Sequence, residues 1–163
     1  TVEYDNSNKK NEKWYINTNQ SFAFADGVVT ASYGSATAKA HADTLWTQQD
    51  SDDGDLPSDK SVGDVKVEGL KTTLIRTLKS QVAGILNDTD WYITRNTEKS
   101  TAIPSAISTH RDAVRTKQAS METQITNASD TPALETLYTY VNTGTEENPV
   151  YEKPLGEVPI LES

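Results

Sequence analysis

Residues 70–93 read LKTTLIRTLKSQVAGILNDTDWYI, and the first part of this stretch decides the fold. Apolar side chains recur there at spacings of three and four, which is the period of one face of an α-helix. They are Leu70, Leu74, Ile75, Leu78, Val82, Ile85 and Leu86. The pattern predicts a long amphipathic helix over 70–86. It should end at residues 87–90, whose side chains compete for backbone hydrogen bonds and so favour a turn.

A second long helix is expected after a polar stretch. Pro104 fits its beginning, because the first turn of a helix does not need the N–H group that proline lacks. Ile107, Val114 and Met121 then give this helix a narrower apolar stripe. Two helices joined through a link that contains Trp91 predict an antiparallel helical hairpin.

The chain after this hairpin predicts one short helix and then an extended arm. Asp130 or Thr131 can cap the helix, and Pro132 fits its first position. Residues 138–141 are rich in tyrosine and valine and suggest a short strand. Residues 142–163 contain three prolines, which favour an arm that lies extended on a surface.

The residues before the hairpin predict a β-rich part. Residues 1–13 are too polar to bury much surface and are expected to form a flexible arm. Residues 14–16 form a short β-favouring run. Residues 21–25 and 28–30 are expected to pair as two strands, because Asp26-Gly27 between them supplies the positive φ of a tight hairpin turn.

The connection from that hairpin to the long helix predicts one further helix and an acidic loop. Residues 35–49 are rich in alanine and have apolar residues at helical spacing, and Ser35 can cap them. The acidic loop, residues 50–55, is a candidate calcium loop. With Gly54 at the sixth position of such a loop, however, Lys60 stands where the bidentate Glu is required. A solvated turn is therefore favoured, and loose Ca²⁺ binding is left open.

These expectations describe an α+β chain. Its parts are a flexible arm (1–13), a β-rich part with one short helix and an acidic loop (14–69), a helical hairpin plus a short third helix (70–141), and an extended C-terminal arm (142–163). The chain has 163 residues, of which 34% are apolar, so the core should be small. Burial against copies of the same chain or against a partner protein is therefore expected.

The net charge of the chain argues against some classes of partner. The net charge of −9 argues against a general nucleic-acid binder, which needs clustered Lys and Arg on its binding face. The charges are uneven, since residues 71–117 hold eight bases and four acids while residues 118–163 hold one base and eight acids. Solvated helix faces are the favoured reading of this asymmetry over a site for an acidic partner. No stretch approaches the roughly 20 apolar residues of a membrane span, and no basic, apolar leader is recognisable.

The sequence offers little chemistry for an enzyme, and no cofactor is expected. Cysteine is absent, and His41 and His110 have no partner at metal-ligand spacing. Neither a phosphate-binding loop nor a nucleophile elbow occurs. Trp14, Tyr15 and Tyr33 could form a platform for a carbohydrate, but aromatic residues on short strands usually pack into a core, which is the favoured reading.

Three short motifs carry a resemblance to a known family. Residues 86–93 read LNDTDWYI, position 104 is Pro, and residues 110–115 read HRDAVR. In this order and spacing they resemble tail fibre assembly-like and related virion proteins of tailed bacteriophages. In that family a helix ending in Leu-x-x-Thr-Asp-Trp is followed by Pro and then by a Tyr-Arg-x-Ala-(Leu/Val)-Arg helix. The matching region spans roughly 70–118, less than a third of the chain.

The resemblance implies a structural component of a phage virion, in the tail, neck or fibre-attachment region. The alternatives are a tail fibre assembly chaperone that is not retained in the particle and, less favoured, a glycan-binding module. Expected partners are other phage structural proteins and copies of the chain, with no nucleic acid and no membrane. The expected location is the virion, after assembly in the host cytoplasm. Two features depart from the family: His110 stands where Tyr is usual, and residues 158–161 replace a Pro-Trp ending.

Six residues of the resembling segment are the candidate structural and interaction residues. They are Asp90, Trp91, Tyr92, Pro104, Arg111 and Arg115. Asp90 is expected to cap the turn, and Trp91 is expected to insert between the two helices, so that Trp91→Ala would cost roughly 3 to 5 kcal/mol. Arg111 and Arg115 are four apart on one helix face, with Asp112 beside them. They can pair with carboxylates of the same chain or of a neighbouring subunit.

Overall fold

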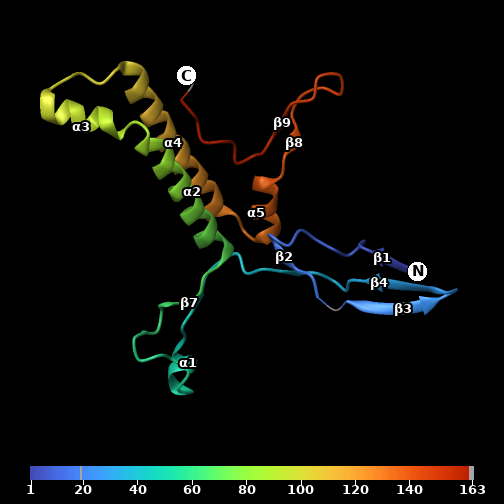
Figure 1. The fold of residues 1–163 in the computed structure, drawn as a ribbon. Helices are drawn as coiled ribbons and strands as arrows, with labels where there is room; N and C mark the ends of the chain where they lie inside the picture. The colour runs from blue at the N-terminus through green and yellow to red at the C-terminus, as the bar shows by residue number, and fades with distance from the viewer. Residues whose placement is uncertain (19, 162–163) are drawn as a thin grey trace. The chain divides into compact units, whose positions relative to one another are not determined.

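The computed structural model describes residues 1–18 and 20–161, and the chain divides into two compact units. The N-terminal unit comprises Thr1–Leu70 and Asp130–Glu135, and the helical unit comprises Lys71–Ser129 and Thr136–Ser163. Small sheets and hairpins make up most of the first unit, and packed helices with a C-terminal hairpin make up the second (Figure 1). The predicted α+β class is confirmed.

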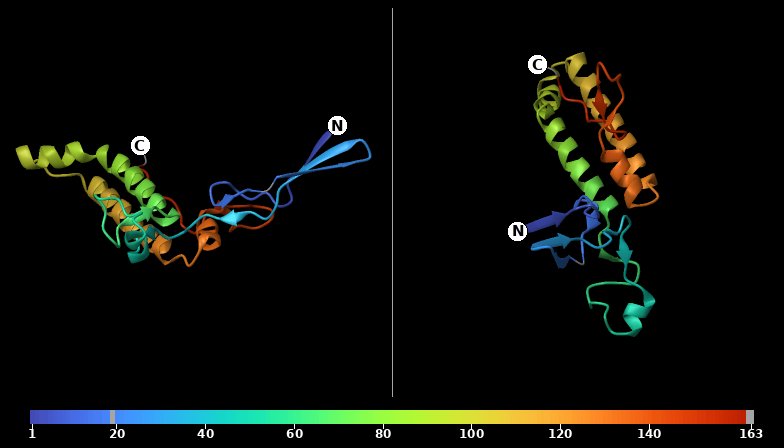
Figure 2. Two further views of the ribbon diagram at one scale, coloured as in Figure 1. Left: turned by 90° about the horizontal axis from the view of Figure 1, so that it is seen from below. Right: turned by 90° about the vertical axis from the view of Figure 1, so that its right-hand side faces the viewer.

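The helical unit is built on an antiparallel pair of helices, as the sequence predicts. The helices after residue 69 are α2 (Leu70–Asn87), α3 (Asp90–Lys99), α4 (Ser105–Asn127) and α5 (Thr131–Tyr138). Helices α2 and α4 lie side by side (Figure 1 and Figure 2). The Lys71 ammonium donates to the Thr126 carbonyl at 2.8 Å near one end of the pair, and Arg111 donates to the Leu86 carbonyl at 2.8 Å near the other. These two bonds fix the antiparallel register.

Aliphatic side chains form the core of the helical unit. The buried ones are Leu74, Leu78 and Val82 on α2, Ile107, Val114, Met121 and Ile125 on α4, and Leu155 and Val158 near the C-terminus. They are four apart on α2 and seven or four apart on α4, which is the helical spacing that predicted the hairpin. Burying each such side chain stabilises the fold by about 1.5–3 kcal/mol. Pro104 directly precedes α4, as expected for the residue that opens the helix.

The C-terminal segment is more ordered than the extended arm expected at 142–163. Strand β8 (Val141–Asn142) pairs antiparallel with β9 (Tyr151–Glu152) to form a hairpin. Leu155 then enters the core with no exposed surface, and its backbone N–H donates to the Leu137 carbonyl at 3.0 Å. The prolines in this segment are compatible with such short strands because none stands at a paired position.

A three-stranded sheet forms one end of the N-terminal unit. Its strands are β1 (Val2–Asp5), β3 (Ser21–Ala25) and β4 (Val28–Ser32), in the order β1-β4-β3 (Figure 1). The predicted hairpin of β3 and β4 is confirmed, and Asp26 and Gly27 take φ values of 51° and 79° in its turn. The expectation of a flexible arm over 1–13 is wrong for β1, which pairs parallel with β4 because its backbone groups find partners along that edge.

Two small ladders replace the helix that was predicted over 35–49. Strand β2 (Tyr15–Ile16) pairs with β5 (Thr37–Ala38), and β6 (Thr44–Leu45) pairs with β7 (Val65–Val67). The surroundings of Gly69 explain why strands form here in place of a helix. A Cβ at this glycine would lie 2.3 Å from the Ala42 carbonyl carbon, so the two backbones approach closely. The helix propensity of the alanine-rich run is a weaker influence than these backbone contacts.

The acidic loop is partly helical. Helix α1 (Gln48–Asp52) begins at a capping box of Thr47 and Asp50, so the solvated turn expected over 50–55 is wrong for its first residues. Asp50 also forms an ion pair with Lys66. The hydrogen bond from Lys66, followed by those from Thr47, lowers the pKa of Asp50 to about 2. Its oxygens are thus engaged by protein donors.

The core of the N-terminal unit contains Trp14, Tyr15, Ala31, Thr131 and Leu134. Trp14, Tyr15 and Thr131 are buried, so two of the three rings of the considered carbohydrate platform belong to the core, as favoured. The Thr131 hydroxyl donates to the Lys39 carbonyl at 2.6 Å, which ties the start of α5 to the β5 region. Asp130 caps α5, because its carboxylate accepts from the Ala133 N–H at 2.8 Å.

Candidate functional site

The residues that carry the family resemblance meet where α2, α3 and α4 join. The sequence predicts a turn and a link at this point, whereas the structure forms the additional helix α3 from Asp90 onward. Only a two-residue turn separates α2 from α3. Propensity did not reveal this helix, because its polar and β-branched composition is a poor helix signal. Its placement changes the roles of Asp90 and Trp91.

Arg111 forms a buried polar lock at this junction. Its Nη1 donates to the Leu86 carbonyl at 2.8 Å and to the Thr89 hydroxyl at 2.6 Å, and its Nη2 pairs with the Asp90 carboxylate at 2.8 Å. Arg111 is 7% exposed and Thr89 is 3% exposed. The Thr89 hydroxyl itself donates to the Leu86 carbonyl at 3.0 Å. A single guanidinium therefore holds the end of α2, the turn and the start of α3 together.

The positions of the charges in this lock are electrostatically favourable. The carbonyls of the last turn of a helix lack intrahelical donors and carry the negative end of the helix dipole, so a cation there is stabilising. Asp90 in the first turn of α3 faces the opposite, positive end of a dipole. Asp90 was expected to cap the turn after the first long helix. It is instead the first residue of α3, whose N-cap is Thr89, and Thr89 makes no side-chain cap bond. Of the two pairings considered for Arg111, the intramolecular one is present.

Trp91 is not inserted between the long helices, contrary to the expectation. Its side chain is 50% exposed. The Trp91 and Tyr92 ring centroids are 3.8 Å apart with an interplanar angle of 33°, and the Arg95 guanidinium lies 4.7 Å from the Trp91 centroid and 5.5 Å from that of Tyr92. The expected loss of 3 to 5 kcal/mol on Trp91→Ala was based on full burial. Half exposure reduces the expected loss to about 1 kcal/mol.

A small hollow of about 210 Å³ lies beside the lock. It is lined by Ile93, Ile103, Ser108, Arg111, Asp112 and Arg115. Arg115 is half exposed and pairs with Asp112 at 3.5 Å, a geometry worth little in water. The hollow thus combines two isoleucine side chains with a weakly engaged cation.

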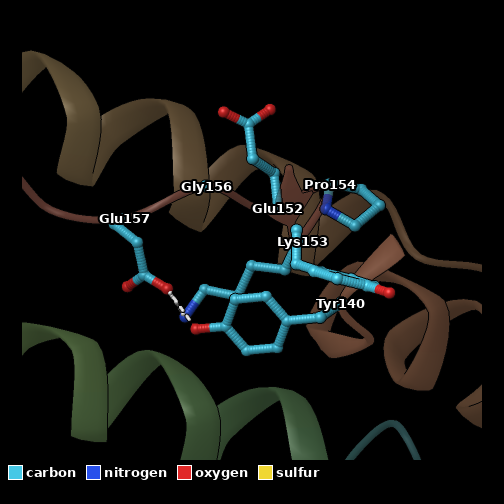
Figure 3. A pocket seen from close by; sticks show the side chains of 7 residues that line it. Tyr140, Glu152, Lys153, Pro154, Gly156 and Glu157 are labelled. Carbon is cyan, nitrogen blue, oxygen red and sulfur yellow. Dashed lines mark hydrogen bonds and ion pairs between the residues drawn. The ribbon is translucent and has the colours of Figure 1, made fainter. Parts of the chain in front are cut away.

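A second hollow, of about 390 Å³, lies beside the C-terminal hairpin. Its lining residues are Tyr140, Tyr151, Glu152, Lys153, Pro154, Gly156 and Glu157. Figure 3 shows the Glu157 carboxylate meeting the Lys153 ammonium and the Tyr140 hydroxyl, at 2.7 Å and 2.8 Å respectively. The Lys153 hydrogen bond is the main cause that lowers the pKa of Glu157, while donation to Glu157 is the main cause that raises the pKa of Tyr140.

This C-terminal cluster was missed by the sequence analysis. The Lys153 and Glu157 spacing of four is a helical signal, yet the segment between them is not helical and Gly156 has a φ of 74°. The charged groups Lys153 and Glu157 of this cluster pair with each other. We call this pair the brace, because it holds the residues beside the C-terminal hairpin together. No sequence motif predicts this brace, because a turn of the backbone brings its two residues together.

Among residues 1–18 and 20–161, no three His, Cys, Asp or Glu side chains are placed to hold a metal ion. No helix in the same part of the chain has both the length and the apolar character to cross a membrane.

Comparison of the chain with models of protein families, with curated proteins and with solved structures finds no match.

Proposed function

We propose that the chain is a structural component of a tailed-phage virion, in the tail, neck or fibre-attachment region, and that it acts through protein–protein contacts. One observation carries the contact-making role. Trp91 is half exposed on a helix whose first turn is locked by Arg111. The phage setting rests on the resemblance of residues 70–118.

Trp91 has the properties of an interface anchor. Tryptophan, tyrosine and arginine are the residues that most often dominate binding energy at protein interfaces, and all three are stacked here as Trp91, Tyr92 and Arg95. The stack and the lock restrict these side chains before a partner arrives. Binding then loses less conformational entropy than it would with free side chains.

The neighbouring hollow indicates what the partner should present. Ile93 and Ile103 suit an apolar side chain, and Arg115 at the same hollow suits a carboxylate next to it. Arg115 keeps its exposed, long contact to Asp112 and can exchange it for a partner's carboxylate at little cost. The expected partners are other phage structural proteins, with the chain's own acidic segments among the candidates when copies assemble.

Mass spectrometry of purified particles from the phage that encodes the chain tests this proposal. The chain should be present in mature particles at a fixed copy number. Trp91→Ala should fold normally but lose incorporation, whereas Tyr151→Ala, which removes another exposed ring, should be incorporated. Absence of the native chain from mature particles, together with its capture on fibres in infected lysates, would favour the fibre-assembly chaperone instead. Normal incorporation of Trp91→Ala would remove the anchor role.

A further inference from the structure

The three-stranded sheet of the N-terminal unit has one face that is made of aliphatic and aromatic side chains. Residues paired directly across neighbouring strands place their side chains on the same face of a sheet. The register therefore aligns two rows across β3, β4 and β1. The rows are Phe22, Ala31 and Tyr4, and Phe24, Val29 and Val2. We call these six residues the aromatic sheet face.

The large side chains of the aromatic sheet face are exposed. Phe24 is 74% exposed, Tyr4 69%, Phe22 67% and Val2 56%. The opposite face carries alternate residues such as Ser21, Thr30 and Ser32, and its Ser21 and Ser32 hydroxyls lie 3.2 Å apart. A sheet with one apolar and one polar face ordinarily packs its apolar face on a core. Among the described residues of this unit, none covers these four large side chains, and only the small Ala31 between them is buried, at 1% exposure.

We propose that the aromatic sheet face is the surface through which two copies of this chain associate, sheet against sheet. Packing of two such faces is the ordinary arrangement of a β-sandwich, with about 10 Å between the sheets. A two-fold axis lets the same patch serve both copies. This inference concerns the N-terminal unit alone and does not rest on the proposed phage function.

The exposed area of the aromatic sheet face reaches the lower bound for a specific contact. Aromatic side chains bury roughly 150–250 Å² each. Three rings at about two thirds exposure, with Val2 and Val29, therefore offer on the order of 500 Å² per copy. Two copies would bury on the order of 1,000 Å², which is the lower bound for a specific interface.

Charge favours a second copy over a charged partner. The chain carries a net charge of −9, so identical copies repel at most contacts. The aromatic sheet face contains no ionisable group that is charged at neutral pH, and the acids of β1, Glu3 and Asp5, belong to the opposite face by alternation. Two such faces can thus meet without apposing like charges. A nucleic acid or a charged peptide would find no counter-charge among the six residues.

Sedimentation equilibrium of the full chain provides the first test. The native protein should self-associate, and Phe24→Ser should raise its dissociation constant by roughly 30-fold or more, as expected for an anchor ring. Val28→Thr is the matched control. Val28 lies in the same sheet, paired with Ala25, but on the opposite face. The dissociation constant of the Val28→Thr variant should therefore stay near the native value. Far-UV circular dichroism checks that both variants keep their secondary structure.

Hydroxyl-radical footprinting of the native chain provides a second test that needs no variant. Raising the protein concentration should protect Tyr4, Phe22 and Phe24 from oxidation. A native chain that stays monomeric at high micromolar concentration would overturn the proposal. Self-association that leaves these three rings unprotected, or that Phe24→Ser leaves unchanged, would also overturn it and would point to another surface, such as the open edges of β1 and β3.

Discussion

The helical unit and the N-terminal unit bury their apolar residues in different ways. Helices α2 and α4 place aliphatic side chains on facing stripes, and Leu155 returns from the C-terminal segment to close that core. The N-terminal unit buries Trp14 and Tyr15 but leaves Phe22 and Phe24 in solvent. The helical unit completes its core within the chain, whereas the N-terminal unit keeps a face suited to another molecule.

Removal of a core side chain from the helical unit should give the largest effect. Leu155 has no exposed surface, so Leu155→Ala should lower the free energy of unfolding by about 3 kcal/mol through lost burial and the cavity left behind. Leu161→Ala removes the same atoms from a side chain that is 45% exposed. This variant should change the free energy of unfolding by less than about 1 kcal/mol. Chemical denaturation followed by circular dichroism measures both. Equal effects of the two variants would show that the C-terminal segment is not part of the core.

The buried lock should come next in magnitude. Arg111→Met keeps most of the apolar stem but removes the bonds to Leu86, Thr89 and Asp90, and should cost about 2 kcal/mol. Arg115→Met breaks only an exposed contact and should cost about 0.5 kcal/mol or less. Thermal unfolding of both variants gives the comparison. A loss at Arg115 that equals the loss at Arg111 would contradict the role given to the lock.

Two glycines should respond in opposite directions to alanine. Gly156 has a φ of 74°, and an added Cβ would lie 2.2 Å from the Lys117 ammonium, so Gly156→Ala should destabilise by about 1–2 kcal/mol. Gly84 lies within α2 with open space around its missing Cβ, so Gly84→Ala should stabilise by about 0.5–1 kcal/mol. The midpoints of chemical denaturation should therefore move apart. A stabilising Gly156→Ala would show that the turn after the hairpin is not constrained.

The smallest effect is a pH dependence at the end of α5. Burial raises the pKa of Tyr138 to about 12. Because the folded-state pKa lies above the unfolded value of about 10, this tyrosine contributes stability that is complete below pH 10 and is lost as the pH rises towards 12. Absorbance titration at the phenolate band should show a late step that Tyr138→Phe removes. A late step that survives this substitution would assign it to another tyrosine.

The two units also differ in how far their folds follow from sequence. The spacing of Leu74, Leu78 and Val82 encodes one face of α2 within a single local stretch, so the helix and its partner could be predicted. Strands such as Thr37–Ala38 and Thr44–Leu45 are two residues long and have no periodicity. Their pairing depends on distant backbone groups, which is why an alanine-rich helix was predicted in their place.

The sequence predicted which residues belong to the candidate site but not how they are arranged. Asp90 and Arg111 were singled out from the motif, and the structure joins them in one ion pair. Trp91 was expected between the two long helices, because no local pattern indicated that α3 would begin at Asp90. The brace of Lys153 and Glu157 was missed because a glycine turn creates it. Local patterns identify which residues matter here, and the chain path decides which of them face solvent.

The bond between Thr131 and Lys39 has a consequence for biosynthesis. It joins residues 92 positions apart, whereas the lock at Arg111 spans 25 at most. Contacts that close long loops form later than local ones. On a ribosome, the strands of the N-terminal unit emerge first, but the piece that completes their unit emerges only after the whole of α4. We therefore expect the nascent helices to acquire protection from hydrogen exchange before Trp14 and its neighbours do, although those neighbours are synthesised earlier.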